Sequence, residues 1–236
     1  MNRKDILQKN LGNVRDRIES ACSRVNRNPD RIRLIAVTKY VDSNTVREMV
    51  DLGLHDFGEN RIQVAEPKLN DLADLPIRWH WIGNLQTNKV RKVLGRFQEF
   101  HSIDRIPLIE AIDERLINHP EETDDEKIPA YLQVNVSGEE TKSGFTRETV
   151  IQGGDRLIES PHLQWVGLMT MAPHFDDPEK TRRVFGRLRE LRESLQTKLR
   201  VTLPKLSMGM SNDFEVAIEE GATDVRIGTI LYEGIL

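Results

Sequence analysis

The feature that most constrains this chain is a regular alternation of short apolar extended segments with helical segments along its 236 residues. The extended segments are bounded by turn residues, whereas the segments between them carry apolar residues at helical spacing. This alternation predicts the α/β class and a single (β/α)8 TIM barrel, with an open doubly wound sheet as the alternative. The expected strands are 33–39, 55–58, 78–82, 99–102, 130–136, 164–169, 205–208 and 224–227.

Apolar spacing and turn residues also place the helices that would surround the barrel. The chain ends nine residues after the last expected strand, too early for a full eighth outer helix. We therefore expect one domain, 1–236, in which the opening helix within residues 1–28 packs on the barrel and fills that gap. The expected helices lie at or near 4–22, 45–53, 90–95, 107–116, 146–160, 184–199 and 214–221.

Composition argues against several classes of partner. A net charge of -4 and a pI near 5.9 provide no general attraction to nucleic acid or to an anionic membrane surface. The single cysteine, Cys22, cannot form an internal disulfide, which is typical of a reducing compartment. Residues 1–30 are charged throughout, and no stretch approaches the roughly 18 apolar residues of a membrane span. We expect a soluble cytoplasmic protein without nucleic-acid or membrane partners.

Lys39 closes the first expected strand, which begins at Arg33. In (β/α)8 barrels the reactive groups sit at the carboxyl ends of the strands. A lysine in a partly apolar site loses solvation of its charged form, so its pKa falls and the neutral amine can attack an aldehyde. The alternative is a lysine that ends the strand and reaches into water.

The turns after the last two expected strands are suited to an anion. After strand seven, Gly209 permits close backbone approach, and Ser211 is placed to cap a helix whose first N–H groups lack partners. After strand eight, Arg226 is followed by Gly228 and Thr229. Each turn alone also fits ordinary helix capping. Barrels commonly bind phosphate at these two loops, however, so their joint position predicts an anion site.

Other chemistries have little support in the sequence. It contains no G-x-x-x-x-G-K-[ST] loop and no G-x-G-x-x-G fingerprint. The six histidines are scattered, without H-E-x-x-H or paired C-x-x-C motifs, so no metal site is predicted. His80 lies between two tryptophans and is interpreted as a packed histidine. The charged segment 121–127 is interpreted as a solvated loop.

Several longer segments of the chain resemble those of one family. The chain resembles the pyridoxal phosphate homeostasis proteins, the YggS-like family, from about residue 30 to residue 231. The segments that carry the resemblance are Ala36–Lys39, Phe57–Asn60, Trp79–Lys89, His101–Arg105, Val134–Gly144, Gly167–Met171, Leu206–Ser211 and Val225–Thr229.

This resemblance implies an alanine-racemase-like barrel that carries pyridoxal 5'-phosphate (PLP). It implies that Lys39 holds PLP as a Schiff base and that Arg226 faces the pyridine nitrogen. Asn60 would be a polar contact at the edge of the ring, and Lys142 matches a second lysine that the family has near the cofactor. The phosphate would be held by Ser211, Gly228 and Thr229.

The resemblance also bears on activity. A permanently charged guanidinium beside the pyridine nitrogen disfavours protonation there, and an unprotonated ring is a poor electron sink. Racemases of this fold type take a second base from an added domain of the partner subunit, and this sequence has no such domain after its barrel. We therefore expect a monomeric PLP carrier or regulator, with apo PLP-dependent enzymes as candidate partners, and not an efficient enzyme.

The sequence departs from the family at two places, and two other functions stay open. Tyr40 stands where the family often has a proline or a short lysine-containing segment, and the end, Leu231–Leu236, lacks a Phe-Gly-x-Arg pattern. The first alternative function is a low-activity PLP-dependent amino-acid racemase or decarboxylase. The second is a barrel that binds a phosphorylated sugar, with Lys39 as an aldolase-type amine.

Overall fold

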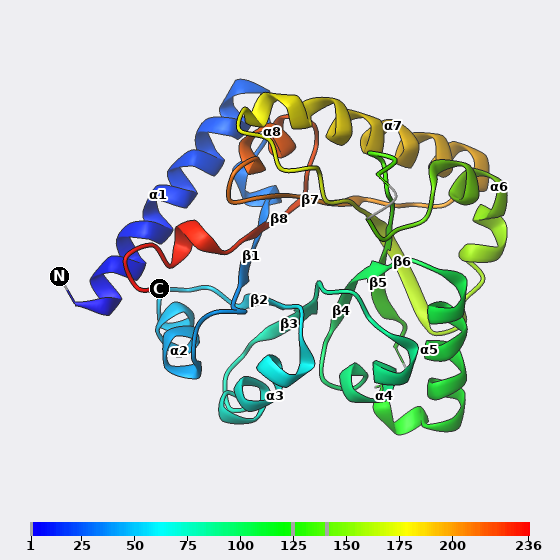
Figure 1. Ribbon diagram of the computed structural model, residues 1–236, viewed down its shortest axis with the longest axis horizontal. Helices are drawn as coiled ribbons and strands as arrows, with labels where there is room; N and C mark the ends of the chain where they lie inside the picture. The colour runs from blue at the N-terminus through cyan, green and yellow to red at the C-terminus, as the bar shows by residue number, and fades with distance from the viewer. Residues whose placement is uncertain (1, 124–125, 140–141) are drawn as a thin grey trace.

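The computed structural model describes residues 2–123, 126–139 and 142–236, which form a closed barrel of parallel strands (Figure 1). Each strand pairs with the next in sequence order, and β8 pairs back with β1. The (β/α)8 prediction is confirmed, and the open-sheet alternative is wrong because the first and last strands are paired with each other. The strands are β1 (Arg33–Val37), β2 (Asp56–Glu59), β3 (Arg78–Trp81), β4 (Glu99–Ile103), β5 (Ile128–Gln133), β6 (Leu163–Met169), β7 (Lys205–Met210) and β8 (Asp224–Ile227).

Helices cover the outside of the barrel and connect successive strands (Figure 1). After β8 the chain forms only the short 3-10 helix η5, and helix α1 packs against η5, α8 and α2. The α-helices are α1 (Arg3–Arg24), α2 (Ser43–Asp51), α3 (Ile62–Asp71), α4 (Val90–Val93), α5 (Ile106–Asn118), α6 (Arg147–Leu157), α7 (Arg182–Leu199) and α8 (Phe214–Glu219), and the 3-10 helices are η1 (Pro29–Arg31), η2 (Thr87–Lys89), η3 (Pro120–Glu122), η4 (Pro178–Thr181) and η5 (Thr229–Leu231).

Several local features differ from the sequence-based expectation, among them the fifth strand, which spans Ile128–Gln133 and not 130–136. Helix α3 was not predicted; Pro67 lies in its interior, where the missing N–H weakens the helical pattern. Helix α2 begins before the predicted Thr45, because the Asp42 side chain caps it by accepting the Thr45 N–H at 2.8 Å. Strand β1 ends at Val37, so Lys39 lies in the turn just beyond the strand.

The segment 121–127, predicted as a solvated loop, begins within η3. Glu122 in that segment accepts from the Nε of Arg115 at 2.9 Å, so part of the segment is tied to α5. Residues 124 and 125 lie outside the described residues. Among the described residues of the segment, Glu121, Glu126 and Lys127 are exposed, as the prediction requires.

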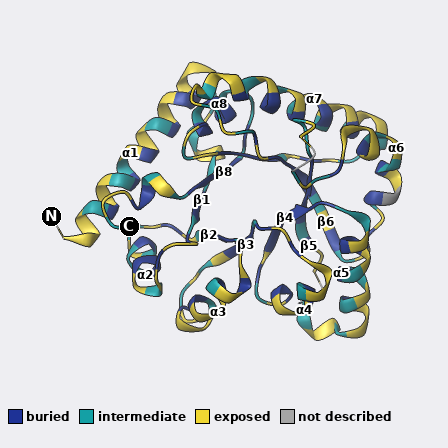
Figure 2. Ribbon diagram, viewed as in Figure 1, coloured by how far each residue is buried: buried dark blue, intermediate teal, exposed yellow. Residues whose placement is uncertain are grey.

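The apolar core lies between the barrel wall and the helices, which turn their buried faces inward (Figure 2). The lower interior of the barrel, at the amino ends of the strands, is instead polar. Arg33 donates to Glu99 at 2.7 Å, to Asp224 at 2.5 Å and to the Tyr131 hydroxyl at 2.9 Å. Branched apolar side chains usually fill this space in TIM barrels. In this chain the space holds side chains of opposite charge that pair with each other, because a buried charge needs such a partner.

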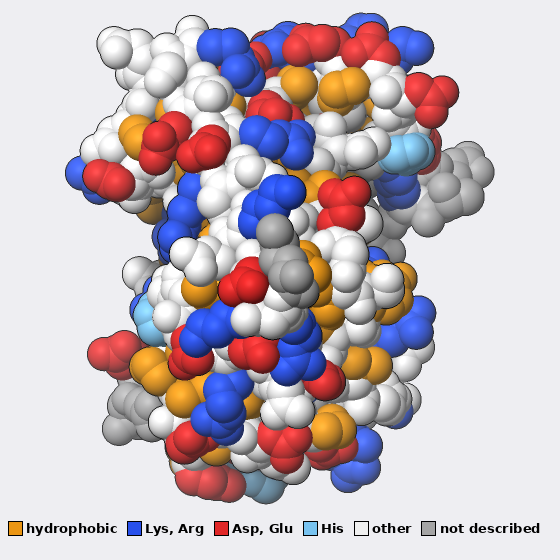
Figure 3. Space-filling model, turned by 90° about the vertical axis from the view of Figure 1, so that its left-hand side faces the viewer, with side chains coloured by type: hydrophobic (Ala, Val, Ile, Leu, Met, Phe, Trp, Pro, Cys, Tyr) orange, Lys and Arg blue, Asp and Glu red, His pale blue; other side chains and the backbone are white. Residues whose placement is uncertain are grey.

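Helix α1 is held to the barrel mainly by its apolar face, on which Leu7 is fully buried. Exposed ion pairs contribute about 0–1 kcal/mol each, whereas burying a leucine side chain contributes about 1.5–3 kcal/mol. Basic and acidic side chains are interspersed over this side of the molecule (Figure 3). The ion pairs from α1 to α2 and α8 are Arg3–Glu48, Lys4–Asp51, Arg17–Glu215 and Arg24–Glu219.

We predict that Leu7→Ala destabilises the protein by about 2–5 kcal/mol, because it leaves a cavity between α1 and the barrel. The matched control is Lys9→Ala, an exposed position on the same helix, which should change stability by less than about 0.5 kcal/mol. Urea unfolding followed by circular dichroism measures both. Equal stability of Leu7→Ala and the control would show that α1 contributes little to the fold.

Candidate functional site

Lys39 lies at the carboxyl end of the barrel, in the turn that follows β1. The register between β1 and β8 pairs Ala36 with Ile227, so this turn lies beside the turn that begins at Gly228. The Lys39 side chain is exposed, and its Nζ lies 4.7 Å from the centroid of the Tyr40 ring. Tyr40 is itself 70% exposed, so the expected partly apolar surrounding is not found among the contacts of Lys39 with the described residues, and its amine reaches solvent at the mouth, as the alternative interpretation has it.

Ser211 links the last two turns to each other. Its Oγ accepts the Gly228 N–H at 3.2 Å, so the turn after β7 is bonded to the turn after β8. A hydroxyl also has one proton to donate, which leaves the Ser211 O–H for an anion. The prediction that Ser211 caps the next helix is wrong, because the residue at that position is Asp213. The Asp213 Oδ1 instead accepts the Met210 N–H at 2.7 Å and closes the turn.

Gly209 makes this turn sterically possible. Its φ is +95°, and a Cβ placed there would lie 2.6 Å from the Cβ of Ala217. A larger residue would therefore push α8 away from β7. Thr229, which follows Gly228, begins η5 and has an exposed side chain.

Arg226 is buried below these turns, with 4% of its surface exposed. It donates from NH1 to Ser207 Oγ at 2.5 Å and from NH2 to the Thr170 carbonyl at 2.9 Å. Burial lowers the pKa of its guanidinium to about 10, and the carboxylates of Asp213 and Asp224 oppose that shift. The guanidinium therefore keeps its charge at neutral pH.

Asn60 follows β2 at the same end of the barrel and carries an unused acceptor. Its Oδ1 is buried and has no hydrogen-bond partner among the described residues. The loop packs tightly there, because a Cβ on Gly83 would lie 2.6 Å from the Asn60 Cα. An unpaired buried polar atom costs about 1–3 kcal/mol. A group bound at the mouth would remove that cost.

Lys142 reaches the rim from the polar loop after β5. Its Nζ lies 3.5 Å from the carbonyl oxygen of Met171, which follows β6, and 3.4 Å from a carboxylate oxygen of Glu139. Residues 140 and 141 of this loop lie outside the described residues. Lys142 is thus at the same end of the barrel as Lys39, on another part of the rim.

A buried group behind β1 was missed by the sequence reasoning. The Nζ of Lys68 donates to the Thr38 carbonyl at 2.5 Å and to Glu59 Oε1 at 2.6 Å, and the Thr38 hydroxyl donates to the same oxygen at 2.6 Å. The bond to the Thr38 carbonyl fixes the peptide that precedes Lys39. The sequence did contain one indication of this pair: Glu59 lies inside a buried strand, and a buried carboxylate needs a cation as its partner.

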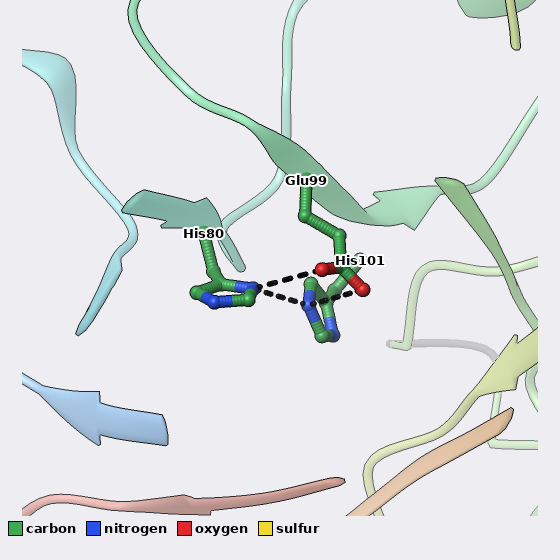
Figure 4. A group of neighbouring side chains, drawn as sticks. All are labelled: His80, Glu99 and His101. Atoms are coloured by element: carbon green, nitrogen blue, oxygen red, sulfur yellow. Dashed lines mark hydrogen bonds and ion pairs between the residues drawn. The ribbon is translucent and has the colours of Figure 1, made fainter. Parts of the chain in front are cut away.

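The interior also brings together side chains that the sequence analysis treated as scattered. His80, Glu99 and His101 point toward one another inside the barrel (Figure 4), and their ligand atoms lie within 4.8 Å of one another. The two rings are hydrogen-bonded at 3.0 Å. Both Glu99 oxygens accept from Arg33, at 2.7 and 2.6 Å. The three side chains are therefore already paired, and a metal ion would have to displace those bonds.

Comparison with known proteins places this barrel in a family. The family model described as the alanine racemase N-terminal domain matches residues 10–235. A pyridoxal phosphate homeostasis protein of Aquifex aeolicus is 44% identical over 222 residues, which cover 94% of this chain and 95% of that protein. One from Pseudomonas aeruginosa is 40% identical over 227 residues, which cover 96% and 94%. The chain belongs to the pyridoxal phosphate homeostasis protein family.

Solved structures agree with this assignment. PipY of Synechococcus elongatus, solved with PLP bound, superposes with a TM-score of 0.82 at 31% identity, covering 96% of this chain and 99% of that one. An alanine racemase of Clostridium difficile superposes with a TM-score of 0.74 at 14% identity, covering 97% of this chain and 56% of that one. The racemase shares the fold alone. None of the described helices combines the length and apolar character needed to span a membrane.

The charged interior predicts a loss of stability in acid. Burial opposes ionisation of Glu99, but the hydrogen bonds and the charge of Arg33 outweigh it and hold its pKa well below the usual 4.5. A carboxyl whose pKa is lower in the folded state stabilises the fold above its unfolded pKa, and loses this as pH falls. We expect the free energy of unfolding to decline below about pH 4.5.

The variant Glu99→Gln tests this origin. At pH 7 it should be about 1.5–3 kcal/mol less stable, because Arg33 loses one of its buried carboxylate partners but keeps Asp224. Its stability should also change less with pH than that of the natural chain. Urea unfolding from pH 7 to pH 3 measures both quantities, and parallel pH profiles for the two proteins would contradict the assignment to Glu99.

Proposed function

We propose that this protein binds PLP at the carboxyl end of its barrel, as a Schiff base on Lys39, and serves PLP homeostasis as a carrier or regulator. The observation that carries the proposal is the convergence of three features at one mouth: the Lys39 amine, the bonded turns at Ser211 and Gly228, and the buried charge of Arg226. The PLP bound in PipY, a relative at 31% identity, supports it.

The residues present fit PLP. The Ser211 hydroxyl has a proton free to donate, and the Thr229 N–H can be added for a phosphate; the Gly228 N–H is bonded to Ser211 Oγ and would have to be shared with the phosphate. The unused Asn60 Oδ1 is a polar contact for the edge of the ring. Lys142 is a second amine on the rim, suited to accept or release PLP transiently.

Arg226 supports a role without strong catalysis. PLP supplies an electron sink for carbanion chemistry when it is bound, and that sink is strongest with a protonated ring nitrogen. The Arg226 guanidinium stays charged at neutral pH and would face that nitrogen, so a second positive charge there is disfavoured. We infer that the protein holds PLP with little turnover, acts as a monomer in the cytoplasm and supplies apo PLP-dependent enzymes.

We predict that Lys39→Ala abolishes the visible absorbance of bound PLP and the mass increment left after borohydride reduction. The reason is that only an amine at this position can form the imine. Lys9→Ala, on the distant face of α1, is the matched control and should keep both signals. A Lys39→Ala protein that still carried reduced PLP would move the attachment site, and Lys142→Ala would then be the next variant to test.

Removal of the Ser211 hydroxyl should weaken retention of PLP by about 1.5–3 kcal/mol, the range for one hydrogen bond to a charged group. Equilibrium dialysis of Ser211→Ala against free PLP measures this. The control is Ser194→Ala, an exposed serine on α7, which should bind as the natural protein does. Equal affinity of both variants would remove Ser211 from the phosphate site.

A carrier and a weak racemase or decarboxylase differ in what they do to amino acids. We expect PLP-loaded protein in D2O to leave the α-proton of L-alanine and of other amino acids unexchanged over hours, because the ring is held unprotonated. Proton NMR follows the exchange, and chiral chromatography follows racemisation. Exchange within seconds at micromolar protein would favour the enzyme.

A further inference from the structure

A continuous chain of hydrogen bonds runs through the barrel interior from Arg226 to the opposite end. Arg226 NH1 lies 2.5 Å from Ser207 Oγ, which lies 2.8 Å from His101 Nδ1. His101 Nε2 lies 3.0 Å from His80 Nδ1 (Figure 4). His80 Nε2 in turn lies 2.8 Å from Asp56 Oδ1. Asp56 is half-buried and the other members are buried, so bulk water competes only at the Asp56 end.

The direction of each bond follows from Arg226. A guanidinium only donates, so Ser207 Oγ accepts from it, and its own proton goes to a second partner because a buried O–H without an acceptor is unfavourable. The other partner of Ser207 Oγ in the described part of the chain is His101 Nδ1, which therefore accepts. A neutral imidazole has one N–H, so His101 carries it on Nε2 and donates to His80 Nδ1. His80 is then protonated on Nε2 and donates to the Asp56 carboxylate.

The hydrogen-bond directions given above require a neutral His101 ring, and the surroundings of His101 favour that form. The ring is fully buried, and burial holds its pKa well below the usual 6.5; the charges of Arg226 and Arg33 act in the same direction, and Glu99 opposes them. The Tyr131 ring stacks on the imidazole with centroids 4.2 Å apart and restricts its rotation. Each hydrogen bond in the series therefore points in the same direction, from Arg226 toward Asp56.

We propose that Ser207, His101, His80 and Asp56 are positioning residues for Arg226, and that they lock both histidines in the Nε2–H tautomer. Hydrogen bonds that all point toward one carboxylate polarise each other and strengthen together. Asp56 thus makes Ser207 a better acceptor and holds the guanidinium in one orientation. The consequence for the PLP ring rests on the proposed function; the tautomers and the orientation of Arg226 do not.

The first test needs no cofactor. We expect two-bond 15N–1H NMR spectra of the PLP-free protein at pH 7 to show His80 and His101 as single Nε2–H tautomers. Signals are assigned with His80→Gln and His101→Gln, since the chain has six histidines. His101 protonated on Nδ1, a mixture of its tautomers, or an imidazolium at either ring would overturn the proposal.

The second test interrupts the series of hydrogen bonds at Ser207. Ser207→Ala removes the hydroxyl, so His101 should lose its single-tautomer signal and the His80 signals should shift as well. Ser207→Thr keeps a hydroxyl and should restore the natural pattern. A His101 spectrum unchanged in Ser207→Ala would contradict the proposal. If Ser207→Ala fails to fold, Asp56→Asn is examined instead; the proposal then requires the ring signals of both histidines to shift, and unchanged signals would contradict it.

A third measurement tests whether the series of hydrogen bonds acts on PLP bound at the candidate site. The absorbance of bound PLP is recorded against pH for the natural protein, Ser207→Ala and Ser207→Thr. We expect Ser207→Ala to shift toward the form with a protonated ring nitrogen, and Ser207→Thr to match the natural protein. Identical spectra for all three would show that the chain does not orient Arg226 toward the ring. Failure of the proposed function would appear differently, as no Lys39-linked PLP in the natural protein while the NMR result stands.

Discussion

The pairing of β1 with β8 is the constraint on which the candidate site depends. It runs in parallel from Arg33 opposite Asp224 to Ala36 opposite Ile227 and closes the barrel. Closure removes both sheet edges and brings the turn at Lys39 beside the turn at Gly228. The same pairing places Arg33 against Asp224 at the lower end, where they form an ion pair at 2.5 Å. This one strand pairing therefore brings the two turns at the mouth of the site together and also forms one of the ion pairs in the barrel interior.

The charged interior explains how this barrel keeps a guanidinium such as Arg226 buried near its mouth. Burial of an unpaired charge is strongly unfavourable, so each buried group here has partners. Arg33 pairs with Glu99 and Asp224 below, and Arg226 is held by Ser207 and the Thr170 carbonyl above. The barrel thus replaces some apolar packing with oriented polar contacts, and it gains a fixed arrangement of charge under the mouth.

The comparison with alanine racemase separates fold from chemistry. That enzyme has the same barrel at 14% identity, and this chain covers 56% of it. The barrel fixes where strand ends meet, whereas the reaction depends on the side chains placed there. In this chain Lys39 is exposed beside Tyr40, and the charge of Arg226 is buried below it. The proposal that this protein holds PLP with little turnover rests on these local features and not on the fold.

The sequence by itself determined the barrel, the order of its strands and the end at which Lys39, Ser211 and Gly228 meet, because hydrophobic spacing and turn residues are local signals. It did not determine that Ser211 bonds to Gly228 or that Lys68 holds the Thr38 carbonyl. Nor did it show that His80 and His101 share a hydrogen bond. Those contacts join residues that are far apart in the sequence and belong to different strands, turns and helices, so only the closed tertiary structure decides which side chains lie within hydrogen-bonding distance of each other.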